Sequence, residues 1–84
     1  MKYNYITSGT CSRSIDFELN ADGTIGDVVF TGGCHGNLQG IAALVRGMKT
    51  EDAIMRLEGI DCRGKGTSCA DQFAKALRAA LAKR

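Results

Sequence analysis

Hydrophobic positions in the first third of the chain follow the two-residue period of β-strands. Apolar and polar residues alternate over residues 14–19, which is typical of a strand with one buried face. Residues 2–7 and 24–31 are rich in aromatic and β-branched residues and predict two further strands. Asp22 and Gly23 form the turn between the second and third predicted strands. An antiparallel meander is the simplest arrangement of three consecutive strands.

The rest of the chain has the three- and four-residue spacing of apolar positions that is typical of amphipathic helices. We expect Asn37 to cap a first helix that ends at Gly47. Thr50 is expected to cap a second helix that ends at Gly59. Ser68 is expected to cap a third helix, because an acidic residue follows three positions later as in a capping box. The apolar stripe of this third helix consists of Cys69, Phe73, Ala76, Leu77, Ala80 and Leu81.

The order of these elements predicts the fold class. Strands that precede helices are typical of α+β domains, so we expect a three-stranded antiparallel meander followed by three helices packed on one face. The 84 residues suffice for one small domain over residues 1–84 and are too few for a catalytic barrel. No catalytic constellation of side chains is apparent, so we do not expect an enzyme that acts alone.

Composition excludes several classes of protein. Hydrophobic residues make up 44% of the chain and charged residues 24%, which is ordinary for a globular domain and not for a disordered one. The net charge of +2 gives no strong signal for nucleic-acid binding, and no apolar run is long enough to span a membrane. The first five residues lack the apolar stretch of a secretion signal, so we expect a cytoplasmic protein with reduced thiols.

The four cysteines are the main chemical feature, and each lies at the end of a predicted element. Cys11 follows the first predicted strand, and Cys34 follows the third within a run of glycines that contains His35. Cys62 lies in the loop before the third predicted helix, and Cys69 opens that helix, where the helix dipole favours a thiolate. We therefore expect the fold to assemble a metal site from residues that are distant in the chain.

Thiolates are soft ligands that suit zinc, our first choice, or an iron–sulfur cluster, our second. We expect Cys11, Cys34 and Cys69 to be the core ligands. Cys62 is the expected fourth ligand, and His35 is held in reserve. The spacing lacks the paired Cys-x-x-Cys pattern, so inert buried thiols, disulfides and redox-active thiols remain alternatives.

A basic, glycine-rich loop precedes the third predicted helix. A helix N-terminus with a nearby lysine binds anions, which makes this loop a weak candidate for anion binding. The phosphate-binding loop pattern is absent, and the alternative is a loop whose glycines allow close approach to a metal site. The candidate anion-binding residues are Lys65, Gly66, Thr67 and Ser68.

Four short motifs follow one another along nearly the whole chain. They are Gly9-Thr10-Cys11-Ser12, Gly32-Gly33-Cys34-His35-Gly36-Asn37, Leu57-Glu58-Gly59-Ile60-Asp61-Cys62 and Thr67-Ser68-Cys69-Ala70-Asp71-Gln72. In this order they resemble the small stand-alone form of the TSCPD domain family. Ala70 stands where the family signature Thr-Ser-Cys-Pro-Asp has its proline, and the second position of a helix tolerates either residue.

The TSCPD family also occurs as a C-terminal domain of some ribonucleotide reductases. The resemblance therefore implies a link to deoxynucleotide synthesis, although the radical-bearing barrel of those enzymes does not fit in 84 residues. It gives an alternative to the metal-binding module: an accessory domain that binds a nucleotide or a ribonucleotide reductase-type protein through residues 63–68.

A fainter likeness is to the U-type iron–sulfur scaffold proteins. In that family a cysteine follows the opening strand, another follows the third strand, and a third opens a late helix. Here Cys11, Cys34 and Cys69 fill those positions, which is compatible with an iron–sulfur cluster. The scaffold pattern has an aspartate soon after the first cysteine, whereas this chain has Ser12 and Arg13.

Overall fold

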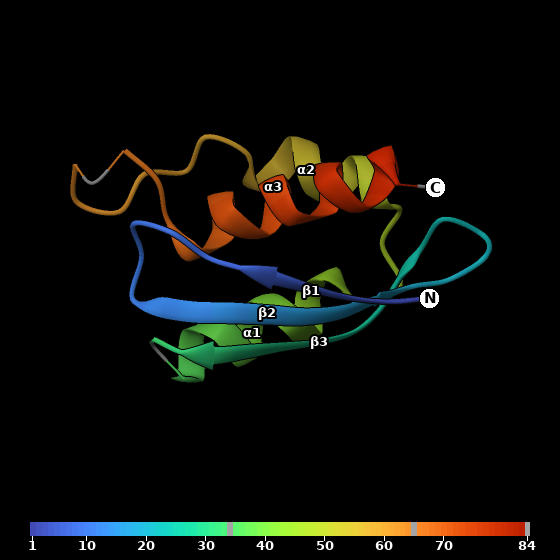
Figure 1. Cartoon of the computed structure of the whole chain (residues 1–84), viewed down its shortest axis with the longest axis horizontal. Helices are drawn as coiled ribbons and strands as arrows, with labels where there is room; N and C mark the ends of the chain where they lie inside the picture. Colours follow the sequence, from blue (N-terminus) through green and yellow to red (C-terminus); the bar gives the residue numbers. More distant parts are fainter. Residues whose placement is uncertain (34, 65, 84) are drawn as a thin grey trace.

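Three antiparallel strands precede three helices in the computed structural model, which describes residues 1–33, 35–64 and 66–83, with only the backbone of His35 (Figure 1). The predicted α+β order is confirmed. The strands are β1 (Lys2–Ile6), β2 (Ser12–Leu19) and β3 (Ile25–Gly32). The helices are α1 (His35–Val45), α2 (Thr50–Leu57) and α3 (Cys69–Ala82).

The sheet has the strand order β1-β2-β3, and both pairings are antiparallel, as expected for a meander. The alternation predicted for β2 is observed, because Ile15, Phe17 and Leu19 are buried while Asp16 is exposed. The register places Tyr3 opposite Phe17 on the face that carries the core. The other face carries exposed side chains, so the helices cover one side of the sheet.

A cluster of aromatic rings attaches α3 to the sheet. Phe73 is fully buried, and its ring packs edge-on against Phe17, with centroids 5.7 Å apart, and against Phe30 at 5.8 Å. Tyr3 stacks on the other side of Phe17 at 5.5 Å. Such ring pairs stabilise a fold by about 0.5–1.5 kcal/mol each beyond the area they bury. This cluster therefore fixes the position of α3 over the middle of the sheet.

The other two helices complete the layer. Helix α1 packs along β3 and buries Leu38 and Val45. Helix α2 lies beside α3 and adds Ala53 and Ile54 to the core (Figure 1). None of the helices in the described residues is long and apolar enough to cross a membrane.

Two predicted helix caps are wrong. Helix α1 begins at His35, so Asn37 lies inside the first turn and is not the cap. Helix α2 has Lys49 at the N-cap position, and the hydroxyl of Thr50 donates to the carbonyl of Gly23 at 2.8 Å instead of capping its own helix. The physical reason is that Thr50 is already the first helical residue, and its hydroxyl and backbone nitrogen both donate to the Gly23 carbonyl.

The predicted helix ends are confirmed. Gly47 follows α1 with a φ of 85°, and Gly59 follows α2 with a φ of 84°. This left-handed backbone conformation is common at helix ends and is favourable for glycine. Each helix therefore ends two residues before the glycine that the sequence marks as its end.

Candidate functional site

The fold brings Cys11 and Cys69 together. Their Sγ atoms are 3.8 Å apart although 58 positions separate the two residues in the chain. Cys11 lies in the β1–β2 connection, and Cys69 is the first residue of α3. A disulfide bond is about 2.05 Å long, so the two sulfurs are adjacent thiols. The expected convergence of these two residues is confirmed, and their role as ligands stays a prediction.

The backbone after β3 passes directly beside this pair. Gly33 has a φ of 80°, and a Cβ atom there would lie 3.1 Å from the Ser12 nitrogen and 3.3 Å from the Cys11 Sγ. Glycine is the residue that tolerates both this backbone conformation and this close approach. Cys34 is the next residue in the sequence, and it lies outside the described residues together with the His35 side chain. We call Cys11, Ser12, Gly33 and Cys69 the thiol corner.

The side chain and backbone of Ser12 lower the pKa of the Cys69 thiol. Burial raises the pKa of the Cys69 thiol, but hydrogen bonds from Ser12, Cys11 and Thr10 together outweigh it, so this pKa lies below its ordinary value. The largest of these favourable contributions come from the Ser12 side chain and backbone. Ser12 is itself buried, so its donors are not shared with solvent. The thiolate is the form of cysteine that binds metals and attacks disulfides.

The start of α3 is held by the side chains of the Thr67-Ser68-Cys69-Ala70-Asp71-Gln72 motif. The Ser68 hydroxyl accepts from the Asp71 amide at 3.0 Å, so Ser68 caps the helix as predicted. The buried Asp71 carboxylate accepts from the Gly59 amide at 2.8 Å and from the Thr67 hydroxyl. The hydrogen bond from Thr67, followed by that from Gly59, keeps the pKa of Asp71 below its ordinary value. Asp71 therefore ties the end of α2 to the start of α3.

Gln72 links the same motif to the β1–β2 connection. Its amide nitrogen donates to the Thr67 hydroxyl oxygen at 3.1 Å, and its amide oxygen accepts from the Ser8 backbone nitrogen at 3.0 Å. Gly9 packs against Thr67, since a Cβ on Gly9 would lie 3.2 Å from the Thr67 Cγ2. These contacts set the position of Cys11 relative to Cys69. Sequence reasoning missed the roles of Asp71 and Gln72, and their place in the family motif was the available signal.

The loop between α2 and α3 is held together by hydrogen bonds from its backbone to the carboxylate of Asp61. Asp61 accepts from the Gly64 amide at 2.6 Å and from the Gly66 amide. Of the residues proposed for anion binding, Gly66 thus donates to Asp61, Thr67 donates to Asp71, and the Ser68 hydroxyl caps α3. Lys65 lies outside the described residues. We call residues 61–66 the Asp61 loop.

Cys62 is exposed and lies in the Asp61 loop, where its backbone nitrogen donates to the Thr67 carbonyl at 3.0 Å. In the part of the chain that the structure describes, no three histidine, cysteine or acidic side chains are grouped closely enough to hold a metal ion. Cys62 is therefore not gathered with Cys11 and Cys69 there. The remaining predicted ligands are Cys34 and the His35 side chain.

Fold and site define a small α+β domain that presents a pair of thiols, drawn from its first loop and its last helix, at one corner of the sheet. The chain belongs to the TSCPD domain family, whose model matches residues 1–81. The resemblance of the four motifs to this family is thereby confirmed. No curated protein and no solved structure gives a significant match to the chain.

Proposed function

We propose that the protein is a small metal-binding module that is not catalytic alone, with zinc as the metal. The observation that carries this proposal is the 3.8 Å separation of the Cys11 and Cys69 sulfurs. Two thiolates on one tetrahedral zinc ion, each about 2.3 Å from the metal, are about 3.8 Å apart. The two sulfurs thus lie at the distance that a shared zinc ion requires.

The proposed ligands are Cys11, Cys34 and Cys69, with Cys62 or His35 in the fourth position. The hydrogen bonds from Ser12 to Cys69 support this set, because donors around a ligand sulfur orient it and favour the thiolate. The glycine conformation at Gly33 supports it as well, since the close approach there leads the chain past Cys11 immediately before Cys34.

An iron–sulfur cluster is the second choice of metal group. In a cubane cluster each thiolate binds a different iron atom, which sets neighbouring cysteine sulfurs farther apart than on a single ion. The short separation between Cys11 and Cys69 therefore favours a single ion over a cubane cluster. A zinc ion here would also join the β1–β2 connection to α3, which suits a domain of 84 residues with a small core.

The alternative is an accessory domain that binds a nucleotide or a ribonucleotide reductase-type protein. Its support is weaker, because the Gly64 and Gly66 amides of the Asp61 loop and the Thr67 hydroxyl before α3 already have partners within the chain. The metal proposal further assumes a reducing compartment such as the cytoplasm, where thiols stay free to bind metal.

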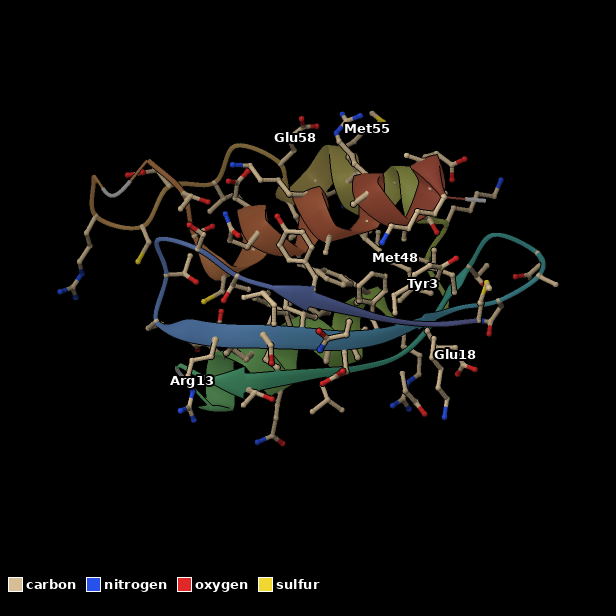
Figure 2. All side chains as sticks on the ribbon, viewed as in Figure 1. Tyr3, Arg13, Glu18, Met48, Met55 and Glu58 are labelled. Carbon is tan, nitrogen blue, oxygen red and sulfur yellow. The ribbon has the colours of Figure 1, made fainter. Side chains whose placement is uncertain are left out.

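Elemental analysis of protein purified without oxygen tests the proposal. We expect about one equivalent of zinc per chain, and a marked loss of zinc in Cys11→Ser and Cys69→Ser. Met55→Ser is the matched control, because Met55 carries an exposed sulfur on the outer side of α2 (Figure 2). It is expected to keep its zinc.

Cobalt titration of the unsubstituted protein gives a second readout that does not depend on the variants folding. Thiolate coordination is expected to produce thiolate-to-cobalt charge-transfer absorption that saturates at about one equivalent. Zinc and iron that together stay far below one equivalent, with no charge-transfer band, would contradict the proposal.

A further inference from the structure

The two thiols of the corner differ in access to solvent. Cys11 is exposed, whereas Cys69 is partly covered at the start of α3. To form a bond of about 2.05 Å, their sulfurs need to approach by about 2 Å. Cys11 lies in a connection between strands and Cys69 in the first turn of a helix, so side-chain rotation and movement of the connection are the motions that would bring the sulfurs together.

We propose that Cys11 and Cys69 form a dithiol–disulfide couple that exchanges with low-molecular-weight disulfides, and that Cys11 reacts first. This function goes beyond metal binding and needs no metal ion. The two roles exclude one another at any moment, because a sulfur in a disulfide cannot act as a thiolate ligand.

The chemistry proceeds in two displacement steps. The Cys11 thiolate attacks one sulfur of an external disulfide, so that a mixed disulfide forms on Cys11 and one small thiolate leaves. The Cys69 thiolate then attacks the Cys11 sulfur, which forms the Cys11–Cys69 bond and releases the second small thiolate. The external disulfide gains two electrons, the protein dithiol loses two, and the two protons of the protein thiols pass to the released thiolates or to water.

The neighbouring sulfur is what favours ring closure over a stable mixed disulfide. A thiol held 3.8 Å away acts at a high effective concentration compared with a free thiol in solution. Cys62 is also exposed, but among the described residues its sulfur is not gathered with Cys11 and Cys69. We therefore expect Cys62 to stop at the mixed disulfide and Cys11 to continue to the internal bond.

The experiment uses chelator-treated, fully reduced protein whose metal content has been measured, under exclusion of oxygen. Glutathione disulfide is the probe, and the reaction is stopped with acid, followed by alkylation, intact mass measurement and peptide mapping. The expected product is a bridged peptide pair that contains Cys11 and Cys69, with both thiols lost to alkylation and no glutathione kept on either. In Cys69→Ser, one glutathione is expected to remain on Cys11.

Met55→Ser is the matched control, because it removes an exposed sulfur outside the proposed ligand set and is expected to give the same bridge. Glutathione that stays on Cys11 in the unsubstituted protein, or a bridge from Cys11 to Cys34, overturns the proposal. These results come from unsubstituted, metal-free protein, so they hold whether or not the variants fold. The two experiments are independent. If no exchange with glutathione disulfide occurs, the zinc content still tests the metal proposal, and if no zinc is found, the exchange reaction still tests the dithiol–disulfide proposal.

Discussion

The thiol corner and the Asp61 loop look alike in the sequence, since both combine glycines, a cysteine and a following helix. In the structure they are built differently. The thiol corner joins three segments that are distant in the chain: the β1–β2 connection, the end of β3 and the start of α3. The Asp61 loop closes on itself through hydrogen bonds between Asp61 and the backbone of Gly64 and Gly66.

This difference shows that glycines serve different purposes in the two segments. The Gly64 and Gly66 amides of the Asp61 loop donate to the loop's own carboxylate, so these two amides are not available to an external anion. The thiol corner instead uses glycine to let distant backbone approach a sulfur, as at Gly33. A local motif thus stabilises the loop, whereas tertiary contacts assemble the corner.

The largest expected contrast is between the two carboxylates. Asp71→Ala removes a buried acceptor and leaves the Gly59 amide and the Thr67 hydroxyl without their partner, so we expect a loss of about 3 kcal/mol in the free energy of unfolding. Asp61→Ala, in an exposed loop, is expected to cost less than about 1 kcal/mol. Urea denaturation of both variants measures this, and equal losses would contradict the assigned difference between the regions.

Two glycines with nearly the same backbone conformation give the next contrast. Gly33 and Gly64 have φ values of 80° and 79°, but a Cβ on Gly33 meets the Ser12 nitrogen at 3.1 Å while one on Gly64 meets nothing within 4 Å. Gly64→Ala is expected to cost about 1 kcal/mol from backbone strain alone. Gly33→Ala is expected to cost about 2 kcal/mol more, because backbone of the corner must move.

Alkylation of the same folded variants shows whether the substitution at Gly33 also changes the surroundings of the Cys11 sulfur. Gly33→Ala is expected to change the alkylation rate of Cys11, and Gly64→Ala is expected to leave it unchanged. A Gly33→Ala variant as stable as Gly64→Ala would show that the close approach is not needed.

Stability of the start of α3 is expected to depend on pH through Asp71. Because the pKa of Asp71 is lowered in the folded chain, its carboxylate contributes stability above the ordinary carboxyl pKa of about 3.9. This contribution is lost as the pH falls through the lowered folded value. Unfolding free energies measured across acidic pH are expected to fall more steeply for the unsubstituted protein than for Asp71→Asn, and parallel curves would contradict this.

The smallest expected effect concerns the link between α3 and the β1–β2 connection. Gln72→Ala removes the acceptor of the Ser8 amide, so we expect a loss of about 1 kcal/mol and faster hydrogen exchange at that amide. Gln39→Ala, at an exposed position of α1, is the control and is expected to leave Ser8 protected. Unchanged exchange in Gln72→Ala would mean that this bond does not hold the connection.

Local patterns predicted most of the fold. The alternation in β2 indicates a half-buried strand without knowledge of its partners, and the Ser68 cap depends on residues three positions apart. The Thr50 cap was wrong because its competing partner, the Gly23 carbonyl, lies 27 positions away. A capping hydroxyl accepts from its own helix, whereas the Thr50 hydroxyl donates to a distant carbonyl, and local sequence does not distinguish these two roles.

The candidate site was predictable only in part. The sequence predicted that cysteines distant in the chain converge, and the structure brings Cys11 and Cys69 together. The partners of Asp71 and Gln72 come from α2 and the β1–β2 connection, and no spacing rule predicts such contacts. Both residues belong to the family motif, so the resemblance singles them out but does not indicate which groups they contact.

The most direct test of the proposed metal site is a crystal structure of protein prepared without oxygen, with diffraction data collected at the zinc absorption edge. We predict one anomalous peak about 2.3 Å from the Sγ atoms of both Cys11 and Cys69. Well-ordered thiols at this corner with no anomalous peak between them, from protein supplied with zinc, would contradict the proposal.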